Sequence, residues 1–203
     1  SLLHAQTLIN LGNAHSLLGD YRQSLNAFHQ AQQIFEVLNA PADKHVLLLD
    51  MAETYLSLNL YPEALATYRE AEGWLSTAGM AHDQARALRG MGSVLMALQR
   101  WPEAEIALAQ ANTLFTKAEN LPFLSSVMLE QAALFVSQGY SDKALQTAKQ
   151  ALGLVSHKTW LAQQIYAHLR LADLQSSNIT VAEDHLQQAE QRLAQVALPQ
   201  LHY

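Results

Sequence analysis

A repeat with a period of 40 residues is the feature that most constrains how this chain of 203 residues can fold. Small residues recur at one position of the repeat in five copies, and three further positions recur with the same step in four copies, without an insertion. A short repeat cannot bury its own apolar face, so successive repeats must stack into one continuous core. The four sets are Gly12, Ala52, Gly92, Ala132 and Ala172; Ser24, Ala64, Ala104 and Ala144; Phe28, Tyr68, Leu108 and Ala148; and Ala31, Ala71, Ala111 and Ala151.

Apolar residues within each repeat lie three and four apart, which is the spacing of an amphipathic helix. Two such stretches alternate in every repeat, separated by short turns that contain Gly, Asn or Pro. Eight Gly and five Pro are too few for a β-sandwich or barrel of this length. The sequence therefore predicts an all-α fold of five helix pairs, with helices at about 3–18, 21–38, 42–58, 61–77, 82–98, 101–118, 122–138, 141–155, 158–176 and 180–196.

The repeat positions also predict how the helices pack. Small residues should let the two helices of one pair approach closely, and the larger residues at 28, 68 and 108 should fill the space between successive pairs. Tyr21, Tyr61 and Trp101 recur at one position and are predicted to be core residues, as is His15. Trp74 and Trp160 lie outside this pattern. Each is therefore either a contact for a partner or a residue partly buried at a helix end.

Several kinds of chemistry lack a signature in this sequence. Without Cys there is no disulfide or thiolate site, which fits a reducing compartment, and a net charge of −6 argues against general nucleic-acid binding. The nine His form no metal-ligand motif, and Gly90-Met91-Gly92 lies mid-helix, where it favours packing over nucleotide binding. Asp83 is expected to cap a helix. No run of about 18 apolar residues predicts a membrane span. We expect a cytoplasmic, non-enzymatic chain without cofactor or metal.

Individual repeats resemble a known family. The first has Leu11-Gly12, His15, Gly19-Asp20-Tyr21, Ser24, Phe28 and Ala31, and the second has Tyr55, Tyr61, Ala64, Tyr68 and Ala71. These residues resemble the tetratricopeptide repeat (TPR), although 40 residues exceed the usual repeat of about 34. Longer repeats of this type resemble those of kinesin light chains, bacterial peptide-sensing regulators and CHAT-domain proteins. The resemblance implies a right-handed α-solenoid forming one array over residues 1–203 of a larger protein, with repeats at 3–40, 41–80, 81–120, 121–157 and 158–197.

The same resemblance implies a surface for partners. In such arrays the first helix of each pair lines a concave groove, where a protein or peptide binds. Ile9, Asp50 and Gly90 stand where the family's carboxylate clamp needs Lys, Asn and a second basic residue, so that version is excluded. The predicted contacts, by repeat position, are Asn13, Leu49, Glu53, Arg86, Arg89, Leu129, Glu130, Tyr166 and Arg170.

Two interpretations of the groove charges remain open. Arg86 and Arg89 lie three apart on one helix face and can grip a carboxylate or phosphate together. Alternatively, acidic residues on the neighbouring helices neutralise them: Asp50, Glu53 and Glu130. The predicted function is a non-catalytic protein- or peptide-binding scaffold in a bacterial protein; the alternative is a ligand- or peptide-sensing domain of a bacterial regulator. Weak homo-association through the end helices is also predicted, with Val181 and residues 196–198 as its contacts.

Overall fold

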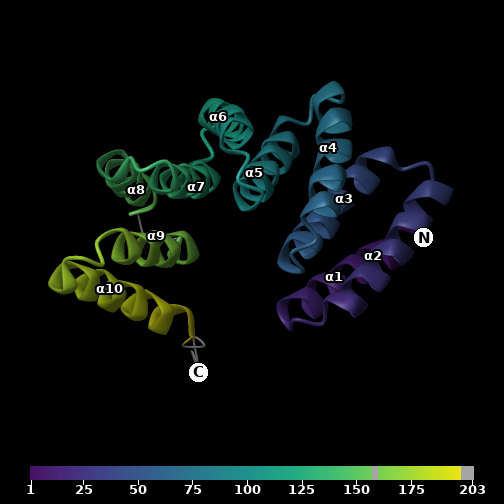
Figure 1. Cartoon of the computed structure of the whole chain (residues 1–203). Helices are drawn as coiled ribbons and strands as arrows, with labels where there is room; N and C mark the ends of the chain where they lie inside the picture. Colours follow the sequence, from purple (N-terminus) through teal and green to yellow (C-terminus); the bar gives the residue numbers. More distant parts are fainter. Residues whose placement is uncertain (157–159, 198–203) are drawn as a thin grey trace. The chain divides into compact units, whose positions relative to one another are not determined.

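The computed structural model describes residues 1–156 and 160–197, and within these ranges the chain forms ten α-helices and no strand (Figure 1). The predicted all-α fold of TPR-like helix pairs is confirmed. Most predicted helix ends lie within one or two residues of the observed ones; the predicted start at residue 158 lies outside the described residues. The helices are α1 Leu2–Leu17, α2 Tyr21–Val37, α3 Pro41–Ser57, α4 Tyr61–Thr77, α5 Ala81–Ala97, α6 Trp101–Lys117, α7 Leu121–Ser137, α8 Ser141–Val155, α9 Leu161–Leu174 and α10 Ile179–Ala197.

The links between helices repeat every 20 residues, at half the period of the sequence repeat. From α1 to α8 each link has three residues, and the second of them has a positive φ, from 49° at Asn39 to 83° at Gly139. Its N–H and that of the next residue donate to carbonyls of the preceding helix, as in Asn59 to Leu56 (2.9 Å) and Leu60 to Tyr55 (2.9 Å). This is the Schellman arrangement, which satisfies the last carbonyls of a helix. These matching links give the first four pairs the same turn geometry, whereas the link between α9 and α10 has four residues, 175–178.

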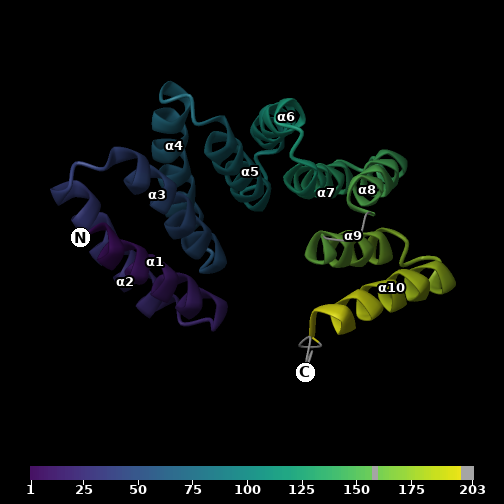
Figure 2. The same cartoon turned by 180° about the vertical axis from the view of Figure 1, so that it is seen from behind.

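The chain divides into two compact units. The first comprises residues 1–110, with α1 to α5 and the first part of α6; the second begins at Ala111 and contains α7 to α10. Within each unit every helix packs on the next one in the chain, as α1 does on α2 and α9 on α10 (Figure 2). First helices of successive pairs also contact each other, α1 with α3, α3 with α5, and α7 with α9. The first helices of each unit therefore lie next to one another.

The small repeat residues lie where the sequence predicted, in buried contacts between helices. A Cβ on Gly12 would collide with the ring of Phe28, and one on Gly92 would lie 2.5 Å from Cδ2 of Leu108. Both contacts join the two helices of one pair. Gly90 instead meets the ring of Tyr68, on the second helix of the preceding pair. The larger repeat residues thus fill space both within a pair and between pairs.

Three predictions about single positions are wrong. Tyr21, Tyr61 and Trp101 are half-buried rather than core residues, and each is the first residue of its helix. The His15 side chain is 29% exposed and lies 3.8 Å from the Asp20 carboxylate. Its position at the end of α1 leaves it at the edge of the core.

The third wrong prediction concerns the start of α5. Met80 is the N-cap residue there and no side chain caps the helix. Asp83 lies in the first turn and accepts a hydrogen bond from Arg86 at 3.1 Å. Trp74 is partly buried in the last turn of α4 and stacks on His45, with ring centroids 4.6 Å apart. Partial burial at a helix end also describes Trp160, the N-cap residue of α9.

Candidate functional site

In the first unit, polar side chains connect the first helices of three pairs. The Arg86 guanidinium on α5 donates to Asp83 (3.1 Å) and to Asp50 on α3 (3.4 Å), and Asp50 also accepts from Asn13 on α1. Burial raises the pKa of Asp50, and the charge and hydrogen bond of Arg86 oppose that rise. Both carboxylates and the guanidinium are only partly exposed. The guanidinium of Arg86 is thus already paired with two carboxylates. For this residue, the structure agrees with the interpretation that acidic residues neutralise the groove arginines.

The other predicted contacts of the first unit differ in accessibility. Leu49 is 2% exposed and belongs to the core, so it offers a partner no surface. Arg89 is half-buried, whereas Glu53 and Asn13 are exposed. Repeat spacing predicted that all of these residues lie on first helices, and in the structure they do. Spacing alone did not distinguish residues on the buried side of a helix from those on its exposed side.

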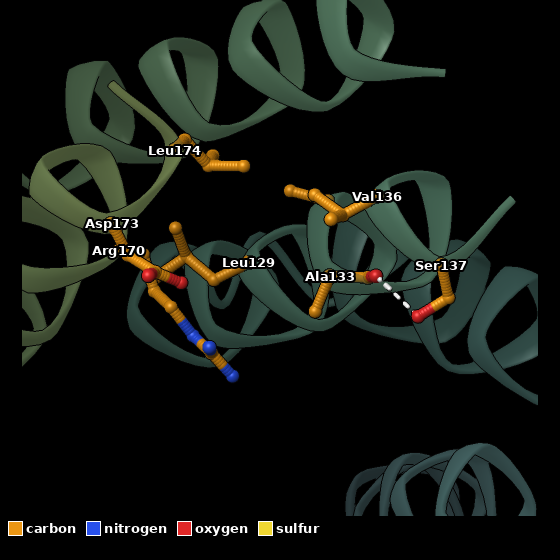
Figure 3. Close-up of a pocket in the computed structure, with 8 residues that line it drawn as sticks. Leu129, Ala133, Val136, Ser137, Arg170, Asp173 and Leu174 are labelled. Carbon is orange, nitrogen blue, oxygen red and sulfur yellow. Dashed lines mark hydrogen bonds between the residues drawn. The ribbon is translucent and has the colours of Figure 1, made fainter. Parts of the chain in front are cut away.

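In the second unit, a pocket of about 230 Å³ lies between α7 and α9 (Figure 3). Its α7 wall is mostly aliphatic, and its α9 wall carries the two charged side chains Arg170 and Asp173. The hydroxyl of Ser137 donates to the carbonyl of Ala133 at 3.1 Å, so that polar group is already satisfied. The lining residues are Leu129, Ala132, Ala133, Val136, Ser137, Arg170, Asp173 and Leu174.

Arg170 is held at this pocket by an aromatic neighbour one turn earlier on α9. Its Nε donates to the hydroxyl of Tyr166 at 3.2 Å, and its guanidinium carbon lies 5.4 Å from the centre of that ring. Among the described residues no carboxylate lies within 4 Å of this guanidinium. The structure therefore brings the predicted residues Tyr166 and Arg170 together beside Leu129. Leu129 is 1% exposed and forms the floor of the pocket rather than a free surface, and Glu130, also on α7, is buried.

Sequence reasoning missed a buried polar cluster between α9 and α10. The Nδ1 atoms of His168 and His185 lie 3.1 Å apart, and Nε2 of His185 lies 3.2 Å from Oε1 of Gln175. Because the amide oxygen only accepts, His185 carries its proton on Nε2, and Nδ1 of His168 donates to Nδ1 of His185. Burial lowers the pKa of His168 to about 4, helped by the charge of Arg192, and burial also lowers the pKa of His185.

The cluster continues along α10. The Arg192 guanidinium donates to the side-chain oxygen of Gln164 (2.7 Å), and the Gln164 amide donates to the carbonyl of Val155 (2.6 Å). The two histidines are 17 residues apart, and only the antiparallel packing of α9 on α10 brings them together. The sequence contained one signal of this cluster, because His168 is a polar residue at a repeat position that is otherwise apolar.

Within residues 1–156 and 160–197, no three His, Asp or Glu side chains are grouped so as to hold a metal ion. No helix in this part of the chain is long and apolar enough to cross a membrane.

Comparison with known proteins gives a sequence match and several structural likenesses. The model of the family described as "Tetratricopeptide repeat" matches residues 3–72. No curated protein sequence matches the chain significantly. Among solved structures, BtubC (BKLC) from P. vanneervenii has a TM-score of 0.75 at 16% identity, over 98% of this chain and 84% of its own. A putative kinesin light chain from Podosopora anserina with TPR-like repeats has a TM-score of 0.70 at 13% identity, over 98% and 99%.

A Rap protein complexed with competence and sporulation factor has a TM-score of 0.85 at 13% identity. The alignment covers 95% of this chain and 54% of the Rap chain. Identities this low establish the fold alone. The sequence match covers the first two repeats, and the TPR-like structures cover nearly the whole chain. Residues 3–72 thus match the tetratricopeptide repeat family, and the chain has the fold of TPR-like helical-repeat structures.

Proposed function

We propose that this chain is a non-catalytic binding module that holds an extended peptide segment of a partner protein against first helices of its repeats. The tetratricopeptide repeat is generally a non-catalytic protein-interaction fold. The observation that carries the proposal is the pocket between α7 and α9, which combines an aliphatic wall with one guanidinium that has no carboxylate within 4 Å among the described residues. Such a pocket suits an apolar side chain next to a carboxylate.

Arg170 is a better candidate for the anion contact than Arg86. The guanidinium of Arg86 already donates to two carboxylates, so an incoming anion would have to displace them. Arg170 is oriented by the ring and hydroxyl of Tyr166, neither of which neutralises its charge. Orientation in advance lowers the entropy that is lost when a ligand binds. We therefore place the anion contact at Arg170 and the apolar contact against Val136 and Leu174.

The test is selection of peptides from a phage-displayed random library on the immobilised chain, followed by anisotropy titration of the selected peptides carrying a fluorescent label. The peptides should share an acidic residue or free carboxylate beside an apolar residue. Arg170→Glu should weaken their binding by at least about tenfold, because a charge-assisted hydrogen bond contributes about 1.5–3 kcal/mol. Failure to select any peptide would contradict the function.

The matched control is Arg22→Glu, the same change of charge at an exposed arginine on α2, a second helix. This variant should bind the selected peptides as the unmodified chain does. Equal weakening by Arg22→Glu and Arg170→Glu would indicate non-specific attraction by net charge and would remove the site assignment, while leaving peptide binding itself intact.

A second candidate is a peptide-sensing domain of a regulator. It is favoured by similarity to two Rap proteins solved with bound ligands, one with competence and sporulation factor and the other, from plasmid pLS20, with the Phr* peptide. Solution scattering with the selected peptides separates the candidates. A sensor should change its radius of gyration when peptide is added, and a rigid scaffold should keep it.

A further inference from the structure

We infer that the pocket between α7 and α9 selects a partner segment in which an apolar residue stands between an acidic and a basic residue, and that Asp173 recognises the basic one. This inference rests on the proposed function, because it names the charge pattern of the peptide held there. Asp173 would then be the residue that determines specificity at the site.

Asp173 and Arg170 carry opposite charges on one face of α9. They are three positions apart, a spacing that brings two side chains to the same side of a helix, and both line the pocket (Figure 3). The Asp173 side chain is exposed, and within the described part of the chain no basic side chain lies within 4 Å of its carboxylate. The pocket therefore offers a ligand both a guanidinium and a carboxylate.

A neighbouring residue explains why these two charges do not pair with each other. Arg86 and Asp83 on α5 are also three positions apart, and they form an ion pair at 3.1 Å. On α9, the hydroxyl of Tyr166 accepts a hydrogen bond from Nε of Arg170 at 3.2 Å. Because Tyr166 is one turn before Arg170 and Asp173 is one turn after it, this bond holds the guanidinium on the side away from Asp173. Both charges thus remain available to a ligand.

The part of the pocket next to Asp173 is built from the ends of two helices. Val136 and Ser137 are the last residues of α7, and Asp173 and Leu174 are the last residues of α9. The C-terminal end of an α-helix carries a partial negative charge, so both helix ends attract a cation. The hydroxyl of Ser137 donates its proton to the carbonyl of Ala133, and its oxygen can still accept from an ammonium group. These features favour a basic side chain at this end of the pocket.

The spacing of the two charges suits an extended peptide. Three residues of an α-helix rise by about 4.5 Å, and side chains two apart on an extended strand are separated by about 6.7 Å, a difference that long side chains can bridge. The side chain between them points the opposite way, towards the aliphatic wall on α7. An acidic residue would meet Arg170, the next residue would pack against Val136, and a basic residue would meet Asp173. The charges fit a peptide running in either direction.

No other first helix of the array carries this pair of charges. The residues at the two equivalent positions of the earlier repeats never combine a basic with an acidic side chain. They are Asn10 and Asn13, Asp50 and Glu53, Gly90 and Ser93, and Glu130 and Ala133. Selection for a segment with both charges would therefore take place at the fifth repeat.

A second copy of this chain is not the occupant that these charges favour. The homo-association predicted from the sequence uses Val181 and residues 196–198. Val181 does not line the pocket, and the side chains of residues 196–198 lie outside the described part of the structure. That association stays a prediction, separate from this pocket.

The test repeats the phage selection on the whole chain and on Asp173→Lys. Peptides selected on the unmodified chain should carry Lys or Arg two positions from the acidic residue, and those selected on Asp173→Lys should carry a second acidic residue there. Labelled synthetic peptides then measure the preference. Replacing the basic residue of a selected peptide by Glu should weaken binding to the unmodified chain by about fivefold or more, and should strengthen binding to Asp173→Lys, because attraction and repulsion exchange places.

The matched control is Asp142→Lys, the same change of charge at an exposed aspartate on α8, a second helix. This variant should keep the preference of the unmodified chain, and an inverted preference would mean attraction by net charge and overturn the inference. Circular dichroism should show unchanged helicity in both variants, since both aspartates are exposed.

The remaining outcomes separate this inference from the proposed function. Selected peptides without a basic residue at that spacing, or with the same preference for the unmodified chain and Asp173→Lys, would overturn the role of Asp173 and leave peptide binding intact. Free leucine carries both charges and an apolar side chain. If it displaced the labelled peptide at concentrations near those of the peptide itself, a free amino acid rather than a peptide segment would be the ligand.

Discussion

At the scale of single residues, the glycines of this chain fall into two physical classes. Gly92 lies under the buried side chain of Leu108, whereas Gly73 on α4 is exposed and has no heavy atom within 4 Å of an added Cβ. Gly92→Ala should lower the free energy of unfolding by up to about 2 kcal/mol, because overpacking costs about 1–3 kcal/mol and helix propensity returns about 1.

Gly73→Ala serves as the matched control and should raise the free energy of unfolding by about 0.5–1 kcal/mol. Urea unfolding followed by circular dichroism measures both variants. Stabilisation by Gly92→Ala would mean that the repeat glycines are not packing residues.

His168 makes stability depend on pH. Its folded-state pKa of about 4 lies below the ordinary value of 6.5, so the unfolded chain binds more protons between these values. The contribution to stability is therefore complete above about pH 6.5 and is lost as the pH falls towards 4, by up to about 3 kcal/mol. Urea unfolding at several pH values should show a shallower fall for His168→Leu than for the unmodified chain. Parallel curves would contradict this account of the buried pair.

At the scale of helices and links, the residue with positive φ in each link affects the stability of the turn. Gln99 has a φ of 57°, a region that costs a residue with a Cβ about 1 kcal/mol and costs glycine nothing. Gln99→Gly should therefore raise the free energy of unfolding by about 0.5–1 kcal/mol. The same substitution at Gln138, the C-cap of α7 with a φ of −90°, should lower it, since no left-handed strain is relieved there. Thermal unfolding of both variants checks the contrast.

At the scale of the whole molecule, binding of a peptide would couple stability to ligand concentration. Anything that binds the folded chain and not the unfolded chain stabilises the fold by mass action. The Tm of the unmodified chain should thus rise as a selected peptide is added, whereas the Tm of Arg170→Glu should rise less. Scanning calorimetry at several peptide concentrations measures this, and equal rises for both chains would argue against the contact at Arg170.

The helices and the core of this protein could be predicted well, because both follow from the spacing of apolar and small residues along the sequence. Residues such as Ala31 and Ala71 recur every 40 positions, and their burial follows once the helices stack. The candidate site was less predictable. Repeat position placed Leu49, Leu129 and Arg170 on first helices, but only the packed structure separates the buried leucines from the accessible arginine.

The sequence by itself determined the fold class, the helix pairs and the close approaches at small residues, since these depend on a periodicity that any stacking of the repeats must satisfy. Tertiary structure alone decided which charges are paired and which faces are uncovered. Asp50 lies 36 positions from Arg86 in the sequence, and His168 lies 17 positions from His185. The side chains of each pair come into contact because their helices pack side by side, and the separation in sequence does not predict such contacts. Leu11 and Met51 occupy the same repeat position. Only the helices around them make one exposed and the other buried.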